Sequence, residues 1–295
     1  MRYTLSDKKT IDRLLSDAGF TFKKSLGQNF LTDPSVCPAM AAAAADADTG
    51  VIEIGPGIGV LTAELALVAK RVVAVELDER LRPVLDKTLA DFENVTVLFA
   101  DVLKLDLKQV IAERFGDCRR VTVCANLPYY ITSPVIMSLL ESRLPVTSIT
   151  VMVQKEAAER LCAPIPGRAA GAVTLAAAYY AEREQLFSVE RSCFTPSPKI
   201  DSAVIRFSIR SEPAVRVEDE KAFFALIKAA FLHRRKTLVN SVSAAGFCSA
   251  AALREEMEQL NIPGTARAEQ LSLEQFAALS ARLAAGQTGE NKFLG

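Results

Sequence analysis

The stretch Asn126-Leu127-Pro128-Tyr129 carries the residue types best suited to chemistry in this chain. It directly follows the apolar run 121–125, which has the composition of a buried strand. The Asn126 side-chain oxygen and the Leu127 carbonyl can accept two N–H bonds, and the Tyr129 ring can stack on a planar group. The stretch therefore predicts a pocket for a planar base with an exocyclic amino group. The alternative is a loop with a proline turn and a packed tyrosine.

Such a pocket suits methyl transfer to N6 of adenine. The N6 lone pair is delocalised into the ring, so hydrogen bonds to Asn126 and Leu127 would localise it and aim it at a methyl carbon. Positioning and electrostatics of this kind contribute up to about 7–11 kcal/mol. No histidine base is required, and the chain has a single histidine, His233. Pro128 would stiffen the turn.

A base inside a duplex cannot reach this pocket, so the target must be single-stranded, looped or flipped out. The proline-rich segment 194–198 precedes the last predicted strand. Phe194 at its start could close the other side of the base. Ordinary core packing of Phe194 is the alternative.

The segment Val51–Gly59 predicts a strand, a glycine turn and the start of a helix. Gly55 and Gly57 let the backbone approach a ligand, and the helix N-terminus presents free N–H groups. A dinucleotide site would carry Gly or Ala in place of Val60, and Glu53 would repel a pyrophosphate. S-adenosylmethionine carries an ammonium and a sulfonium group and no phosphate, so the loop favours this cofactor over NAD. A tight turn without a ligand is the alternative.

Two acidic residues close the neighbouring predicted strands. Glu76 lies 21 positions after Gly55, where an acid can accept bonds from both ribose hydroxyls. Asp101 follows the third strand and can accept a bond from an adenine amino group. Each acid alone could be a helix cap or a surface charge. The glycine loop and these two acids lie at three successive strand ends, in the crevice of an α/β sheet, and together they predict one cofactor site.

Strand-like apolar runs alternate with helical patterns along the first half of the chain. The predicted strands are Val51–Ile54, Val72–Val75, Val95–Phe99, Val121–Ala125 and Ile149–Val153, with helical spacing at Leu61–Lys70, at Glu79–Leu89 and in the alanine-rich run 39–45. This order predicts an α/β fold, a Rossmann-like parallel sheet with helices on both faces. Two further strands are expected at Gln185–Val189 and Ala203–Ile209.

From Glu220 onward the sequence predicts only helices and turns, and Ser211–Asp219 is expected to be a linker. The expected domains are therefore two. Residues 1–210 form a methyltransferase domain with an N-terminal arm, and residues 211–295 form a small all-helical C-terminal domain that contacts RNA or the ribosome.

The composition is that of a soluble globular protein, with 50% hydrophobic and 24% charged residues. The N-terminus lacks an apolar signal region, and no apolar run approaches the roughly 18 residues of a membrane span, so a cytoplasmic protein is expected. The six cysteines are scattered without a CxxC pair and are expected to be small buried hydrophobic residues. No metal site is expected.

Two basic segments are candidate RNA contacts, although the net charge is zero. The first 36 residues hold six Lys and Arg against four acidic residues, and residues 191–240 hold ten against five. Such patches supply phosphate contacts and a salt-dependent affinity. The basic residues assigned to RNA are Lys23, Lys24, Arg234, Arg235 and Lys236. A solvated face is the alternative for each patch.

The chain resembles the small-subunit (16S) ribosomal RNA adenine N6,N6-dimethyltransferases through nearly its whole length. The segments that carry the resemblance are Lys23–Leu31, Glu53–Gly59, Asn126–Tyr129, Met152–Glu156, Phe194–Ala203 and Arg234–Leu238. The resemblance implies a cofactor site formed by Gln28, Asn29, Leu31, Gly55, Gly57, Glu76, Asp101 and Asn126. The arm residues would fold over the cofactor, the glycines would line its methionine end, and Asn126 would bridge cofactor and target.

By the same resemblance, the target is two adjacent adenosines near the 3′ end of 16S rRNA, each methylated twice within a pre-30S particle. A monomer is expected. Ala170 departs from the family pattern, where an aromatic residue is more usual, and leaves the role of the loop 167–171 open.

Three alternatives stay open from the sequence. The first is a non-catalytic RNA-binding ribosome assembly factor, although such a scaffold would not need the intact 126–129 pocket. The second is a large-subunit rRNA adenine dimethyltransferase of the macrolide-resistance type. The third is a DNA or small-molecule methyltransferase built on the same sheet.

Overall fold

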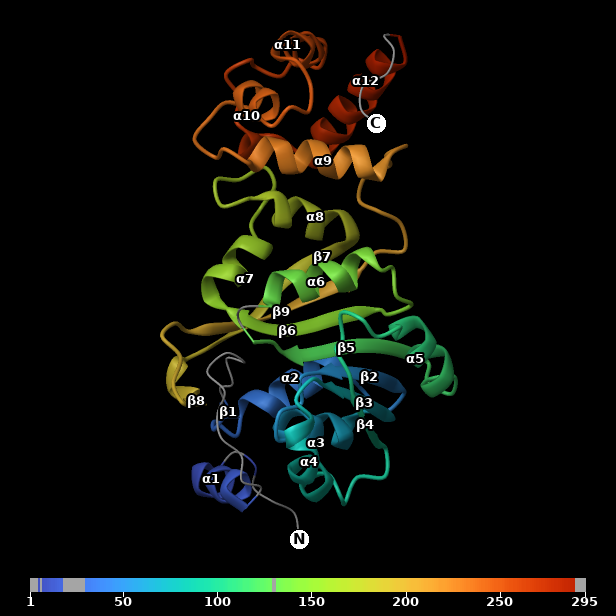
Figure 1. The fold of residues 1–295 in the computed structure, drawn as a ribbon, viewed down its shortest axis with the longest axis vertical. Helices are drawn as coiled ribbons and strands as arrows, with labels where there is room; N and C mark the ends of the chain where they lie inside the picture. Colours follow the sequence, from blue (N-terminus) through green and yellow to red (C-terminus); the bar gives the residue numbers. More distant parts are fainter. Residues whose placement is uncertain (1–4, 6, 18–29, 129–130, 290–295) are drawn as a thin grey trace. The chain divides into compact units, whose positions relative to one another are not determined.

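The computed structural model describes residues 5, 7–17, 30–128 and 131–289. The chain divides into two compact units, which are shown with the element labels in Figure 1. Unit 1 comprises residues 1–158 and 182–209, and unit 2 comprises residues 159–181 and 210–295. The helical unit thus takes in residues 159–181 as well as the segment beyond 210.

Unit 1 is built on a seven-stranded sheet with the order β4-β3-β2-β5-β6-β9-β7 (Figure 1). Its strands are β2 (Thr49–Ile54), β3 (Arg71–Glu76), β4 (Val95–Phe99), β5 (Arg120–Asn126), β6 (Ser148–Gln154), β7 (Ala181–Val189) and β9 (Ser202–Ile209). Strands β2 to β6 are parallel, as predicted. Strand β9 runs antiparallel to β6, so the whole sheet is mixed; the sequence predicted β9 as a strand without an orientation.

The strand order explains why the carboxyl ends of β2 to β5 face one crevice. The chain runs from β2 through β3 to β4 on one side and then returns to pair β5 with the other side of β2. Every residue of β2 is buried, which requires cover on both faces of the sheet, so the predicted Rossmann-like fold with helices on both faces is confirmed.

The helices of unit 1 follow the predicted alternation. They are α1 (Lys8–Asp17), α2 (Val36–Ala44), α3 (Val60–Val68), η2 (Glu79–Leu81), α4 (Arg82–Thr88), α5 (Leu107–Arg114) and α6 (Thr132–Glu141). Helices α2 and α3 share one hydrophobic cluster with buried residues of the central strands, among them Val51 and Cys124. This packing fixes the start of α3 against the end of β2.

A second, two-stranded sheet was not predicted. Strand β1 (Phe30–Leu31) pairs antiparallel with β8 (Phe194–Thr195), and Leu31 lies opposite Phe194. The segment η3 (Arg191–Cys193) precedes β8, and the Cys193 carbonyl accepts bonds from the Thr32 N–H at 2.8 Å and the Thr32 hydroxyl at 3.1 Å. This pairing joins the arm to the segment that the sequence indicated only as a proline-rich loop.

Unit 2 is helical around its own core. Helix α7 (Lys155–Leu161) leads into it, and α8 (Ala172–Tyr180), α9 (Glu220–Phe231), α10 (Leu238–Ala244), α11 (Ala250–Gln259), η4 (Ala268–Gln270) and α12 (Leu273–Gly289) follow. Leu175 and Tyr179 of α8 are buried in one cluster with Phe223 and Phe276. The Tyr179 hydroxyl also donates to Glu220 at 2.7 Å.

Two expectations from composition are refined by the structure. Cys37 and Cys124 are buried as predicted, but the other four cysteines are partly exposed, so they are not core residues; all six are free thiols. Among the helices of the described residues, none is long and apolar enough to cross a membrane.

Candidate functional site

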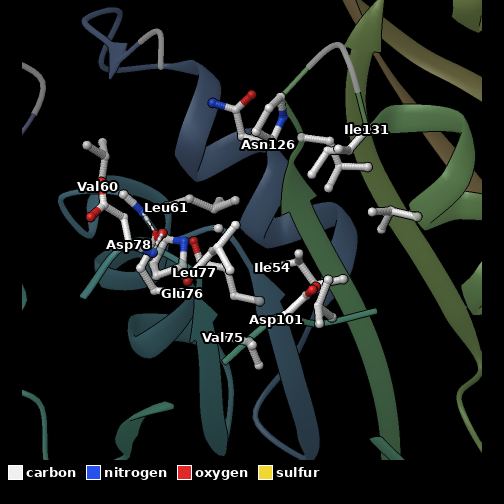
Figure 2. A pocket seen from close by; sticks show the side chains of 18 of the residues that line it. Ile54, Val60, Leu61, Val75, Glu76, Leu77, Asp78, Asp101, Asn126 and Ile131 are labelled. Atoms are coloured by element: carbon white, nitrogen blue, oxygen red, sulfur yellow. Dashed lines mark hydrogen bonds between the residues drawn. The ribbon is translucent and has the colours of Figure 1, made fainter. Parts of the chain in front are cut away.

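A cavity of about 300 Å³ opens at the carboxyl ends of β2, β3, β4 and β5 in unit 1. Its walls include the glycine loop and the residues directly after each strand. Figure 2 shows Glu76, Asp101 and Asn126 around this one space. The volume is at the lower end of the range of small-molecule sites, roughly 300–1,000 Å³. The glycine loop, Glu76 and Asp101, which were predicted to form one cofactor site, therefore lie around one cavity, together with Asn126.

The glycine loop adopts the backbone conformation that its sequence predicts. Gly55, Gly57 and Gly59 have φ angles of +71°, +59° and +89°, which side-chain-bearing residues rarely adopt. A Cβ added to Gly55 would meet no atom within 4 Å, whereas at Gly59 it would come within 3.1 Å of Leu89 and 3.2 Å of Thr88. Gly55 thus leaves open space at the cavity, and Gly59 allows helix α3 to pack closely.

Glu76 ends β3 and is held in place by backbone donors. Its Oε2 accepts a bond from the Gly57 N–H at 3.1 Å, and its Oε1 accepts one from the Asp78 N–H at 2.8 Å. Burial raises the pKa of this carboxyl, and the two N–H bonds partly offset that effect. Each carboxylate oxygen keeps further acceptor capacity, because it can take more than one hydrogen bond. Glu76 can therefore hold the glycine loop and at the same time accept hydrogen bonds from hydroxyl groups of a ligand.

Asp101 directly follows β4 and lies on another wall of the cavity, in the predicted place. Its Oδ1 accepts a bond from the Leu103 N–H at 3.1 Å, and Lys104 lies 3.6 Å from its Oδ2. Leu77, Val102 and Leu103 add apolar surface beside the two acids. Sequence analysis missed these three residues, although each lies within two positions of an acid that it identified.

Asn126 is the last residue of β5, and Leu127 and Pro128 continue the cavity wall. The Pro128 carbonyl accepts bonds from the Ile131 N–H at 3.1 Å and the Thr132 hydroxyl at 3.3 Å, so the proline turn leads directly into α6. Tyr129 lies outside the described residues. The predicted stacking role of Tyr129 stays a prediction.

Glu53 is a lining residue that was not assigned to the site. It precedes Ile54 at the end of β2, is 1% exposed, and reaches the cavity. Within the described part of the chain its Oε2 has no hydrogen-bond partner. Burial raises the pKa of Glu53 to about 8. Glu53 was used in the sequence analysis only as an acid that would repel a pyrophosphate, and it was not placed among the site residues.

Leu31 and Phe194 both line the cavity and are both buried. Phe194 also belongs to the hydrophobic cluster that contains residues of α2 and α3. Its side chain therefore packs in the core and also lines the cavity. Its assignment to RNA stays a prediction. Gln28 and Asn29 of the arm lie outside the described residues.

The basic turn, which we define as residues 233–236, lies in unit 2 between α9 and α10 and is exposed. The Arg234 guanidinium donates to the carbonyls of Arg168 and Ala170, at 3.2 and 3.3 Å, so it also ties the turn to the loop 167–171. Lys23 and Lys24 lie outside the described residues. Among the residues that are described, no cluster of three or more His, Cys, Asp or Glu could hold a metal ion.

Comparison with known proteins agrees with this geometry. A family model described as ribosomal RNA adenine dimethylase matches residues 19–285. The chain belongs to this family. A relative named ribosomal RNA small subunit methyltransferase A, from Bacillus licheniformis, is 47% identical over 274 residues, which cover 92% of this chain and 94% of the relative. A relative of the same name from Staphylococcus aureus is 45% identical, covering 90% of this chain and 91% of the relative.

Two solved structures share the fold. The 23S rRNA methyltransferase ErmE is 26% identical with a TM-score of 0.65, covering 86% of this chain and 99% of that one. A dimethyladenosine transferase from Plasmodium falciparum is 24% identical with a TM-score of 0.69. The match covers 84% of this chain and 95% of that one. The family model and the curated relatives confirm the expected enzyme class, an rRNA adenine dimethyltransferase. The large-subunit alternative is not favoured, because the relatives at 47% identity carry the small-subunit name.

Proposed function

We propose that this protein transfers methyl groups from S-adenosylmethionine to N6 of two adjacent adenosines near the 3′ end of 16S rRNA. The products are N6,N6-dimethyladenosines, formed during small-subunit biogenesis. The observation that carries the proposal is the single cavity that joins Glu76, Asp101 and Asn126, in a chain that is 47% identical to small-subunit relatives over 92% of its length.

The residues of the cavity fit the proposed cofactor. Glu53 offers a buried oxygen without a partner, which suits a cationic group, and the open space at Gly55 admits a close ligand. Glu76 can accept bonds from the ribose hydroxyls, and Asp101 can accept one from the adenine amino group. When bound, S-adenosylmethionine supplies a methyl group on a sulfonium sulfur, which is a strong electrophile.

Asn126 and Leu127 would prepare the target nitrogen. The Asn126 side-chain oxygen and the Leu127 carbonyl accept the two N6–H bonds of adenine, which localises the N6 lone pair toward the methyl carbon. That lone pair forms the new C–N bond, the electrons of the broken S–C bond stay on sulfur, and the N6 proton leaves to solvent. In the second round only one N6–H remains for these two acceptors.

The proposed substrate is small-subunit rRNA in a pre-30S particle, with the target adenosines outside a duplex. The basic turn of unit 2 would contact phosphates, and Tyr129 would stack on the base. A monomer that acts in the cytoplasm is the prediction from the sequence.

The test mixes the purified protein with S-adenosylmethionine carrying a radiolabelled methyl group and with under-methylated small ribosomal subunits. The RNA is then digested and the labelled nucleosides are identified. Label in N6,N6-dimethyladenosine from 16S rRNA is the expected result. Absence of label, with cofactor and subunits both bound, would overturn the catalytic proposal in favour of an assembly factor.

A further inference from the structure

The glycine loop beside the cavity is held by a residue that does not itself line the cavity. Thr88 is the last residue of α4 and is 7% exposed, and its hydroxyl donates to the Ile58 carbonyl at 2.9 Å. Ile58 lies between Gly57 and Gly59, and its side chain is fully buried. Of the described residues, Thr88 and Ile58 both lie outside the set that forms the cavity wall.

The Thr88 hydroxyl has two carbonyls within reach. A threonine in a helix often donates to a carbonyl of its own helix, three or four residues earlier. The Leu85 carbonyl is such an acceptor, but it lies 3.5 Å from the Thr88 hydroxyl, whereas the Ile58 carbonyl lies at 2.9 Å. A hydroxyl has one proton to donate, and the shorter distance directs it to the loop. The bond therefore joins α4 to the glycine loop.

Two adjacent residues of the loop are thereby tied to the same neighbouring segment of the chain. The Gly57 N–H donates to Glu76 at the end of β3, and the Ile58 carbonyl accepts from Thr88 at the end of α4. The Ile58 side chain belongs to a hydrophobic cluster that also contains residues of α4 and α1. Both the backbone and the side chain of Ile58 are therefore fixed by elements outside the loop.

The loop needs such external support because of its composition. Gly55, Gly57 and Gly59 all have positive φ, and glycine has the widest choice of backbone conformations. A loop that becomes ordered only when a ligand binds loses affinity, whereas a loop already held in its binding conformation does not. A hydrogen bond that holds the loop can therefore raise ligand affinity without touching the ligand.

We propose that Thr88 is a positioning residue for the cofactor, which acts through the Ile58 carbonyl to hold the glycine loop in its ligand-binding conformation. This inference rests on the proposed function, because the ligand is the cofactor named there. The target base would meet Asn126 and Leu127 at the end of a different strand, β5. Loss of the Thr88 hydroxyl should therefore raise the KM for the cofactor and leave kcat at saturating cofactor unchanged.

Calorimetry with S-adenosylhomocysteine, the demethylated product, tests the inference without turnover. Thr88→Val keeps the shape of the side chain and removes the hydroxyl, so the dissociation constant should rise about 3- to 10-fold. Thr88→Ser keeps the hydroxyl and should bind as the wild type does. Thr88→Ala forms a second pair with Thr88→Ser that differs only by the hydroxyl, so the comparison does not depend on the fold of the valine variant.

Thr122 offers a matched control in the same unit. Its hydroxyl also donates to a buried backbone carbonyl at 2.9 Å, that of Ala44 at the end of α2, and Thr122 is 2% exposed. Thr122 lies near the start of β5 and is not among the residues that line the cavity. Thr122→Val should lower the urea midpoint about as much as Thr88→Val does, yet leave the dissociation constant of S-adenosylhomocysteine unchanged.

Hydrogen exchange of the backbone amides in residues 55–59 reports on the loop directly. Without ligand, these amides should exchange faster in Thr88→Val than in the wild type or in Thr122→Val. The difference should shrink when S-adenosylhomocysteine is bound, because the ligand then holds the loop. A residue that served only the stability of unit 1 would not produce a change confined to the loop.

The outcomes separate this inference from the proposed function. An unchanged dissociation constant in both Thr88→Val and Thr88→Ala would overturn the positioning role. Equal weakening in Thr122→Val would overturn it as well, because the loss would then reflect general destabilisation. A fall in kcat with an unchanged KM for the cofactor would place the effect at the target and also overturn the role. Failure of the wild-type protein to bind S-adenosylhomocysteine would instead overturn the proposed cofactor.

Discussion

At the scale of single residues, the residues that line the cavity have two different proposed roles: some hold the ligand and others face a reacting atom. Glu76 is engaged by two backbone N–H donors, so its carboxylate is fixed before any ligand binds. Asn126 sits at the last position of β5, where the strand fixes its backbone and its side chain lines the cavity. These two residues therefore have different expected phenotypes.

Replacing Asn126 with Ala removes one of the two acceptors proposed for the target N6–H groups. We expect the turnover number to fall by about 10²-fold or more, with RNA binding and fold retained. Single-turnover methyl transfer and a filter-binding assay on the same preparation measure both quantities. Gln109→Ala, which removes an exposed amide on α5, is the matched control and should leave turnover unchanged. Equal loss of turnover and RNA binding in Asn126→Ala would refute the assigned role.

Replacing Glu76 with Gln keeps the shape of the side chain but removes its negative charge. The Glu76 carboxylate accepts hydrogen bonds from the Gly57 and Asp78 N–H groups and, in the proposal, from the ribose hydroxyls. Hydrogen bonds to a charged group contribute about 1.5–3 kcal/mol, so the cofactor dissociation constant should rise about 10- to 100-fold. Calorimetry measures it directly. Glu79→Gln, at an exposed acid of η2, should leave the constant unaltered. An unchanged constant in Glu76→Gln would remove Glu76 from the site.

At the scale of elements, the glycine loop and the basic turn are the two segments whose local geometry serves the site or its substrate. The loop must bend sharply between β2 and α3 and still allow the helix to pack. The turn combines an exposed charge with hydrogen bonds to a neighbouring loop. Each makes a prediction that a single substitution can test.

Gly59→Ala should destabilise the protein by about 1–3 kcal/mol, because φ is +89° and the new Cβ would crowd Leu89 and Thr88. Cofactor binding should weaken as the loop shifts. Gly116→Ala is the matched control, since a Cβ there meets nothing within 4 Å and its φ is not in the left-handed region. Urea unfolding of both variants measures the difference. Equal stability of the two would show that the loop tolerates a side chain.

In the basic turn, Arg235→Ala and Lys236→Ala should weaken binding to small subunits uniformly. Each should lower the slope of log affinity against log salt by about 1. Arg234→Ala should in addition loosen the loop 167–171, because its guanidinium bonds to the carbonyls of Arg168 and Ala170 are lost. Protease cleavage in that loop reports this second effect. Arg216→Ala, at an exposed arginine of the same unit, is the control. An unaltered salt slope in the turn variants would show that the basic turn is a solvated surface that does not contact RNA.

At the scale of the whole molecule, the chain enters the helical unit twice. Leu175 and Tyr179 of α8 are buried in one cluster with Phe223, although 39 residues separate α8 from α9 along the chain. The predicted domain 211–295 therefore omits part of the core that the helices of unit 2 share.

The fragment 211–295 should accordingly fail to fold on its own, because the cluster would lose α8 and expose the apolar faces that α8 covers. Circular dichroism and thermal unfolding of the fragment measure this, with the intact chain as the reference. In the intact chain Leu175→Ala should cost about 2–5 kcal/mol, whereas Ala substitution of the exposed Leu232 should cost little. A cooperatively folded fragment 211–295 would show that the boundary predicted at 210/211 is the domain boundary.

The sequence by itself determined the local features of the protein. Apolar runs and helical spacing located all five central strands and the helices near 39–45, 61–70 and 79–89, because both patterns depend on residues close together in the chain. The helices α5 and α6 were not located in this way. The glycine loop and the strand-end residues Glu76, Asp101 and Asn126 were found for the same reason, since parallel strands bring their carboxyl ends to one edge. The motifs also indicated the protein family by resemblance, and the comparisons confirmed that family.

Only the tertiary structure decided what depends on contacts between distant segments. The antiparallel pairing of β9, the β1–β8 sheet and the place of α8 in the helical core all join residues far apart in sequence, and local patterns do not encode such pairings. The same holds for Glu53: its residue type was visible, but its burial without a partner arises from the elements packed around it. Burial sets the free energy of a charge, and burial is a property of the fold.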